Sequence, residues 1–481
     1  MNQKSLYILC LLIFTLGCSD FLDVEPDLQV SYNEQLSTRE GVLEAYNGVY
    51  RDLEDVFSST YLIYPEVLGG NLTFTPSVTR NMVDIPIAIE NTYNFNSNPD
   101  EMDYQEYYQD LYDVINQVNL LLENKDNMPF FDSNELSQLE AELLSIRAIA
   151  HYQVSLLFAQ NINFTTDGSH LGVIYNTNQL TAGEDFPSRL SMVQTNEQIA
   201  SDLDTALSVY TSAQLLGGPD YSYFNTQTTT AFYARIALQM NDWEKAQSLA
   251  ETIIDISGVE LMDTANYISE WEQPELPVSE VIFELTAPRS SEGNISSTVS
   301  QYFQYSSPTN YGNYVASGDL LDFYEDNDIR KELFLIQNLN QLVNGELLSE
   351  EFYFTKKFQN DAGTTIIRLS EMYLIHAEAS ARLGQNGKAL ESLNAIRERA
   401  NLEPLMEETQ ILEEIFMERR RELAFEGHLF FDSLRFKRDI VRDQGCISNN
   451  CNLSYPSDFM ILPIPASSID LNENIQQNEG Y

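Results

Sequence analysis

Apolar residues recur at helical spacing from residue 37 onward. Val42, Tyr46 and Val49 follow each other at intervals of four and three residues, which is the spacing of one face of a helix. The Ser37-Thr-Arg-Glu40 stretch before them has the sequence of a capping box. The same periodicity predicts further helices at about 103–123, 134–160 and 195–210. We therefore expect a chain dominated by α-helices.

Two later stretches have the pattern helix, tight turn, helix. They are residues 229–255 and 369–400. In the second stretch, Gly384 and Gly387 mark the turn between two apolar stripes. Such pairs resemble tetratricopeptide repeats, although their irregular spacing does not give a regular array. A last helix is expected over about 409–426, ended by Gly427.

Two segments between the helical blocks lack this periodicity. Residues 58–100 are rich in Asn, Thr, Pro and Tyr. Residues 256–365 combine turn residues with short strand-like runs such as EVIFELTA and EFYFTKKF. Long irregular segments inside a compact protein commonly carry function. We therefore look for ligand-binding residues in these two segments.

The first residues have the pattern of an export signal. Lys4 precedes an apolar stretch that is too short to span a bilayer, which needs roughly 20 apolar residues. The LGC tripeptide that follows resembles a bacterial lipobox, in which the cysteine, here Cys18, is acylated. Residues 1–17 are then a lipoprotein signal peptide, and the acidic residues 18–36 form a lipidated tether. An ordinary signal peptide with a chance cysteine is the alternative.

The charge balance excludes some partners. The chain has 26 Lys and Arg against 73 Asp and Glu, a net charge of −47. Loss of residues 1–17, whose one charge is Lys4, leaves 25 against 73, or −48. Such a chain repels nucleic acid, whose binding depends on Lys and Arg neutralising phosphates. It also repels anionic head groups, so a lipid rather than a basic patch would hold it to a membrane.

Two cysteines remain after Cys10 leaves with the signal and Cys18 takes the lipid. Cys446 and Cys451 lie close together in GCISNNCNLSYP. An exported chain meets oxidising surroundings, which favour a local disulfide between them. A metal site is the alternative, but no histidine or second cysteine pair stands nearby in the sequence to complete four ligands.

Several longer motifs resemble one family, the SusD/RagB-like outer-membrane lipoproteins of Bacteroidetes. In chain order they are CSDFLDVEPD, LSIRAIAHYQVSLLF (144–158), PSRLSMVQTNEQIASDLDTAL (187–207), TTTAFYARIALQMNDWEKA (228–246), IRLSEMYLIHAEASARLGQNGKALESLNAIRERA (367–400) and IFMERRRELAFEGHLFFDSLRF (415–436). The resemblance covers essentially the whole mature chain. It implies a single, mainly α domain over residues 37–481. In this domain four tetratricopeptide-like helix pairs form an α/α superhelix, and variable loops with short strands, at about 58–100 and 256–365, form the ligand face.

The resemblance also implies a function without catalysis. Such proteins bind oligosaccharides, or in some members peptides, at the cell surface. They sit as a lid on a SusC-like TonB-dependent outer-membrane transporter and are not enzymes. The chain has no HExxH, GxSxG, Walker or GxGxxG motif. We therefore expect no catalytic residue, no cofactor and no metal site.

Sugar binding depends on loop aromatics, because pyranose C–H faces stack on aromatic planes while Asn, Asp and Arg side chains hydrogen-bond the hydroxyls. The segment SQYFQYSSPTNYGNYVASGD (300–319) lies where the family often places ligand-contacting aromatics. The loops before the helix at 103–123 are expected to supply the other wall. The candidate ligand-binding residues are Tyr302, Tyr305, Tyr311, Tyr314, Trp271, Asn71, Arg80, Tyr93, Phe95 and Asn98.

These observations lead to one expected function and two alternatives. We expect a lipoprotein that is anchored in the outer membrane, faces the cell exterior and captures an oligosaccharide or polysaccharide for the SusC-like transporter. A net charge of −48 disfavours a polyanionic glycan, so a neutral glycan is favoured. A peptide-binding RagB-type uptake protein is the alternative, which fewer clustered aromatics would favour. A helical-repeat protein that binds only its partner is the third possibility.

Overall fold

The structure is a computed structural model that describes residues 31–59, 61–181, 183–273, 277–286, 298–358, 363–406 and 409–481. The expected signal peptide, the expected lipid site Cys18 and residues 18–30 of the expected tether lie outside the described residues. The last part of that tether is helical, since it contains α2 (Tyr32–Gln35), which packs on the following helix.

Helices dominate the described part of the chain, as the apolar periodicity predicts. The long helices are α3 (Arg39–Phe57), α6 (Gln105–Asn124), α7 (Ser133–Phe158), α8 (Met192–Val209), α9 (Thr226–Gln239), α10 (Trp243–Ile256), α14 (Leu369–Arg382), α15 (Asn386–Arg399) and α16 (Ile411–Glu422). The shorter helices are α4 (Ile63–Gly69), α5 (Glu90–Tyr93), α11 (Tyr267–Trp271), α12 (Ser300–Phe303), α13 (Gly318–Leu321), α17 (Leu429–Arg435) and α18 (Ala466–Leu471), and single 3-10 turns occur at Ile87–Ile89, Lys125–Asn127, Asp220–Ser222, Ile329–Leu333 and Asp458–Met460.

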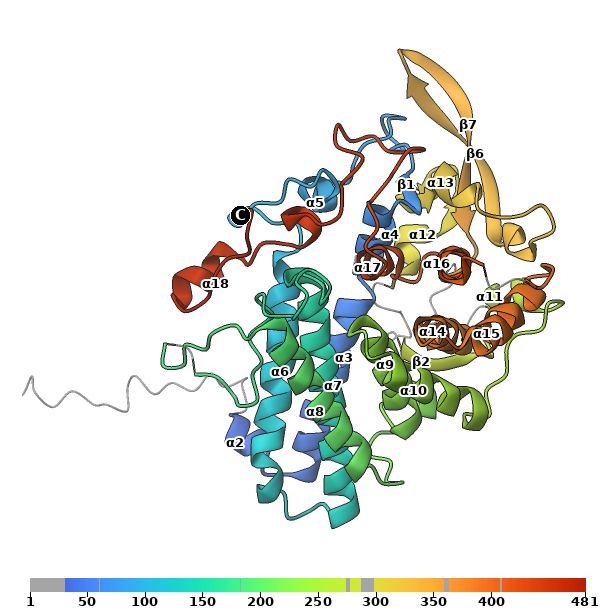
Figure 1. The fold of residues 1–481 in the computed structure, drawn as a ribbon. Helices are drawn as coiled ribbons and strands as arrows, with labels where there is room; N and C mark the ends of the chain where they lie inside the picture. The colour runs from blue at the N-terminus through green and yellow to red at the C-terminus, as the bar shows by residue number, and fades with distance from the viewer. Residues whose placement is uncertain are drawn as a thin grey trace, which may run out of the picture.

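Four pairs of long helices build the scaffold. Helix α3 packs on α6, α7 on α8, α9 on α10, and α14 on α15. Contacts of α6 with α7 and of α10 with α14 join the pairs to one another. Figure 1 shows α3, α6, α7 and α8 side by side, with the other two pairs next to them. The chain therefore has the mainly α architecture that the sequence predicts.

Two predicted helix ends differ from the observed ones. Helix α3 begins after Thr38, whose side chain accepts a hydrogen bond from the backbone N–H of Gly41 (3.1 Å). Ser37 is therefore not the cap, and its hydroxyl donates to the carbonyl oxygen of Glu34 instead (2.6 Å). The last predicted helix, α16, ends at Glu422 and not at Gly427.

Helix α4 explains the early end of α16 and interrupts the segment 58–100 that we expected to be irregular. All of its residues are buried. The Glu66 carboxylate accepts hydrogen bonds from the backbone N–H groups of Phe425 (3.0 Å), Gly427 (3.2 Å) and His428 (3.0 Å). Burial raises the pKa of Glu66, and these N–H groups act in the opposite direction. The turn after α16 is thereby fixed to α4.

A buried ion network occupies the centre of the molecule, around Glu422. This carboxylate pairs with Arg330 (3.0 Å), Arg368 (2.6 Å) and Arg399 (2.5 Å). Burial alone would raise the pKa of Glu422, but these guanidinium groups outweigh it and hold the pKa well below its usual range. The network joins α15, α16 and the strand before α14.

The strands form four separate two-stranded antiparallel sheets in the described residues. They pair β1 (Leu72–Phe74) with β5 (Tyr314–Ala316), β2 (Val281–Thr286) with β8 (Gly363–Arg368), β3 (Tyr305–Ser307) with β4 (Asn310–Tyr311), and β6 (Phe334–Val343) with β7 (Glu346–Thr355). The β6–β7 hairpin is longer than the short strands that we expected, and Figure 1 shows it projecting from the upper right. Its Asn344-Gly345 turn has two positive φ angles, as a type I′ hairpin requires.

Candidate functional site

Strand pairing brings together two segments that we expected to form opposite walls of a ligand site. β1 lies beside β5, with Leu72 opposite Ala316. Thr75 extends the contact, since its N–H donates to the Asn313 carbonyl oxygen (3.0 Å) and its hydroxyl donates to the Gly312 carbonyl oxygen (3.0 Å). The two segments therefore form one continuous part of the structure.

Tyr305 and Tyr311 stand opposite each other on β3 and β4, and we call them the tyrosine pair. Their ring centroids are 6.3 Å apart and their planes differ by 10°. Phe354 of β7 contacts both rings, at 5.1 and 6.0 Å between centroids. The Tyr311 hydroxyl donates to the Pro76 carbonyl oxygen (2.8 Å). Both tyrosines are half-buried.

Gly312 allows the tyrosine pair to sit close to α12. A Cβ atom at this position would lie 2.2 Å from the backbone oxygen of Tyr302, so only glycine fits here. Tyr302 itself is half-buried, and its ring packs against Tyr314 with 6.2 Å between centroids. Tyr302 is therefore a third half-buried tyrosine in this segment.

Four candidate residues are buried, and we correct the expectation that they line an open surface. The exposed fractions are 1% for Tyr314, Tyr93 and Asn71 and 6% for Trp271. The rings of Tyr314 and Tyr93 both pack on Phe74, because aromatic side chains complete the core beneath these loops. Trp271 ends α11 instead of lying in a loop. The Asn71 amide joins α4 to α16, since it donates to a glutamate on α4 (2.8 Å) and accepts from an arginine on α16 (2.8 Å).

The remaining candidates lie nearer the surface. Arg80 is exposed and forms an ion pair with Asp84 (2.7 Å). Asn98 is also exposed, and its side-chain oxygen accepts a hydrogen bond from the Asp100 N–H (2.8 Å). Phe95 is half-buried and has a positive φ of 51°. These three side chains are less buried than the four residues above, and the contacts observed for them in the described residues do not include the tyrosine pair.

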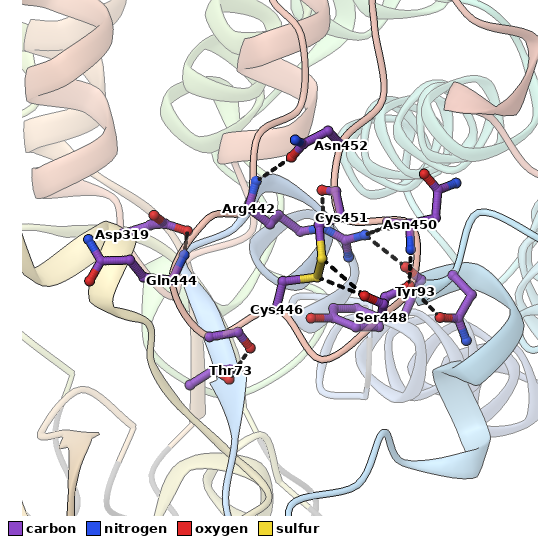
Figure 2. Close-up of a disulfide and its surroundings, with 12 residues drawn as sticks. Thr73, Tyr93, Asp319, Arg442, Gln444, Cys446, Ser448, Asn450, Cys451 and Asn452 are labelled. Carbon is purple, nitrogen blue, oxygen red and sulfur yellow. Dashed lines mark hydrogen bonds between the residues drawn. A yellow bond between two sulfur atoms is a disulfide. The ribbon is translucent and has the colours of Figure 1, made fainter.

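Cys446 and Cys451 form a disulfide, and Figure 2 shows the loop around it. Arg442 lies beneath this loop and is 3% exposed. Its Nε donates to the Cys451 carbonyl oxygen (3.0 Å), and its Nη2 donates to the carbonyl oxygens of Asn450 (2.7 Å) and Tyr93 (3.0 Å). The loop is thereby tied to the segment that precedes α6.

The sequence analysis missed Arg442, which organises this side of the candidate site. Its guanidinium carbon lies 4.2 Å from the ring centroid of Tyr93 and 4.7 Å from that of Phe95. Burial lowers the pKa of Arg442 to about 10. The Thr73 hydroxyl also binds this loop, through the Gly445 carbonyl oxygen (2.7 Å). The sequence carried one signal for this role: Arg442 is a basic residue in a strongly acidic chain, and it stands shortly before the two cysteines.

The described residues lack two further features. They contain no helix that is long and apolar enough to cross a membrane. They also contain no group of three or more His, Cys, Asp and Glu side chains arranged to hold a metal ion.

The fold and the site define a class of protein in which a scaffold of helix pairs carries a surface built from loops and hairpins. Residues 338–481 match the family described as "SusD family", and residues 20–238 match the one described as "Starch-binding associating with outer membrane". The chain belongs to the SusD/RagB-like family.

Individual relatives agree with this assignment. SusD-like protein P38 of Formosa agariphila is 22% identical over 99% of both chains. The starch-binding protein SusD of Bacteroides thetaiotaomicron is 34% identical over 127 residues, which are 25% of this chain and 22% of that protein. The crystal structure of a SusD superfamily protein from Bacteroides thetaiotaomicron superimposes with a TM-score of 0.79 at 26% identity, over 92% of this chain and 99% of the other. A putative sugar binding protein from Bacteroides vulgatus gives 0.77 at 24% identity, over 92% and 98%.

Proposed function

We propose that this chain is a non-catalytic glycan-binding protein and that the tyrosine pair is part of its binding surface. The observation that carries the proposal is the geometry of Tyr305 and Tyr311, two half-buried residues whose rings are near-parallel. Phe354 and the hydrogen bond to Pro76 hold the rings in place before a ligand arrives. Rigid aromatic surfaces of this kind favour stacking on the C–H faces of sugar rings.

The surroundings of the tyrosine pair favour a neutral glycan. The exposed residues of the connecting turn and its neighbours are Ser306, Pro308, Thr309 and Asn310; none is charged, and the polar groups of Ser306, Thr309 and Asn310 suit sugar hydroxyls. Arg80, the one arginine among the candidates, is already paired with Asp84. A net charge of −47 adds a general repulsion of polyanions. A neutral oligosaccharide or polysaccharide is therefore the proposed ligand.

The proposed cellular role follows the family. A lipid on Cys18 would anchor the chain in the outer membrane, with the binding surface facing the cell exterior. A SusC-like TonB-dependent transporter would then receive the bound glycan. The family description that names association with the outer membrane, and the names of the sugar- and starch-binding relatives, support this role.

Affinity electrophoresis tests the proposal directly. The soluble chain (residues 19–481) is run in native gels that contain neutral or anionic polysaccharides. We expect one neutral glycan to retard it. Tyr305→Ala and Tyr311→Ala should each weaken binding about tenfold or more, because the loss of an aromatic contact costs roughly 1–2 kcal/mol.

Matched variants separate stacking from other effects. Tyr311→Phe keeps the ring and should keep most of the binding, and Tyr32→Ala removes an exposed tyrosine from α2, far along the chain, without effect. Retardation that both alanine variants leave unchanged contradicts the role of the tyrosine pair. Absence of retardation by every glycan, with peptide co-purifying from native membranes, would favour the peptide-binding alternative. Absence of both ligands would favour a protein that binds only its transporter.

A further inference from the structure

A cavity of about 360 Å³ lies between the first half of α7, the loop at 210–225 and the start of α9. None of its lining residues belongs to the tyrosine pair or to the segments around it. In Figure 1, α7 and α9 occupy the lower half, whereas α12, next to the tyrosine pair, lies in the upper right. The cavity is therefore a second site, separate from the one proposed above.

The loop that forms one wall of this open cavity is fixed on both sides. Thr211 N–H donates to the side-chain oxygen of Gln138 on α7 (3.1 Å). The Tyr223 hydroxyl donates to the Gly217 carbonyl oxygen within the loop (2.8 Å), and its ring meets Tyr50 of α3 edge-on at 5.3 Å. The cavity is thus formed without a ligand, which lowers the entropic cost of binding one.

The polar groups in the lining differ in how well they are satisfied. The Glu142 carboxylate is almost fully buried and accepts hydrogen bonds from Tyr50 (2.6 Å) and Gln138 (2.8 Å). In contrast, the side chains of Ser212 and Asp220 are exposed to solvent and that of Gln227 is half-buried at the cavity wall. These groups remain available to a ligand.

The chemistry of the lining selects a class of ligand. No Lys or Arg lines the cavity, so an anion has no counter-charge there. Leu215 and the ring of Tyr223 supply apolar wall, and the three available groups supply donors and acceptors for hydroxyls. The volume lies at the small end of ligand sites, which span roughly 300–1,000 Å³. We propose that this cavity binds one neutral pyranose ring, either as a free sugar or as the end of a chain.

Calorimetric titration of the full chain, purified in detergent, tests this site. The probes are the methyl glycosides of glucose, galactose, mannose and xylose, with methyl glucosaminide as the cationic comparison. A ligand this small should bind with a Kd of about 1–10 mM. We expect at least one neutral glycoside to bind, and Ser212→Trp, which places a large side chain at the cavity, to weaken it about tenfold or more.

Three further variants distinguish binding at the cavity from binding at the tyrosine pair. Ser201→Trp, at an exposed serine of α8 outside the cavity, should leave binding unchanged, and Gln227→Leu should weaken it without a bulky side chain. Tyr311→Ala should have no effect on the small glycosides. Loss of their binding in Tyr311→Ala but not in Ser212→Trp would overturn the second site while supporting the first. No binding of any neutral probe, or tighter binding of the glucosaminide, would overturn the proposal, whatever the polysaccharide gels show.

Discussion

Arg442 is a buried cation whose partners are carbonyl oxygens and aromatic rings. Three backbone carbonyl oxygens accept its hydrogen bonds, and its guanidinium lies over the rings of Tyr93 and Phe95. Cation–π contacts gain strength when they are removed from water, which offsets part of the desolvation cost of the charge. Arg442 thereby holds the disulfide loop against the segment that contains Tyr93.

Replacing Arg442 should destabilise the protein more than replacing a surface arginine. Arg442→Ala leaves buried carbonyl oxygens unpaired and a gap between two rings, which should cost about 2–4 kcal/mol of unfolding free energy. Arg442→Lys should recover only part of this, because an ammonium lacks the planar fork of donors. Urea unfolding measures the effect. The control, Arg80→Ala, removes one exposed ion pair and should change stability by about 0.5 kcal/mol or less. Equal effects of the two alanine substitutions would contradict this view of Arg442.

At the scale of single elements, two glycines should respond oppositely to the same change. Gly312→Ala places a Cβ 2.2 Å from a backbone oxygen of α12, so β4 or α12 must move. We expect a loss of roughly 1–3 kcal/mol and weaker glycan binding, because the tyrosine pair is displaced. Gly48→Ala in α3 meets nothing within 4 Å and should stabilise the protein by about 0.5–1 kcal/mol. Thermal unfolding and native gels of both variants check the two signs.

The elements also show what the sequence could predict. The long helices follow from apolar periodicity, because that pattern is local; α3 and α6 each bury one face, whereas the central helix α7 is buried on nearly all sides from Ala141 to Phe158. The Asn344-Gly345 turn carried a local hairpin signal as well, and the analysis overlooked it. The burial of Tyr93 and Tyr314 was not predictable, because both depend on Phe74, which reaches them only through the pairing of β1 with β5. Loop aromatics alone cannot distinguish a ligand surface from a small core beneath it.

At the scale of the whole molecule, buried carboxyl groups of two kinds should give opposite pH dependences. Burial raises the pKa of Glu54 and of Glu284 to about 7. Below the unfolded pKa, near 4.5, both states are protonated and neither group affects stability. Between this value and 7 the unfolded chain ionises while the folded carboxyl groups stay protonated, so stability falls as the pH rises, and the loss is complete above about 7. Glu422, whose pKa is lowered, instead stabilises the fold above the unfolded pKa and loses this contribution as the pH falls.

Amide substitutions measured at two pH values test this assignment. Glu54→Gln and Glu284→Gln should each stabilise the protein by about 1–3 kcal/mol at pH 8 and have little effect at pH 5, since one pKa unit corresponds to about 1.4 kcal/mol. Glu422→Gln should destabilise it strongly at pH 8, because three buried guanidinium groups lose their shared partner. Unfolding curves at pH 5 and pH 8 give the signs. A gain that is equal at both pH values for Glu54→Gln would show that packing, and not ionisation, is responsible.

The pairing of β1 with β5, and the hydrogen bond from Thr73 to Gly445, have a consequence for folding order. The candidate surface is assembled from the early, middle and late parts of the chain, whereas the pairs α9–α10 and α14–α15 close through short turns. Contacts of high sequence separation close only after a large entropic cost has been met, so they form late. A chain with folded helices in which β1 has not yet paired with β5 would present an incomplete ligand surface. Binding competence therefore reports completed folding of the whole chain.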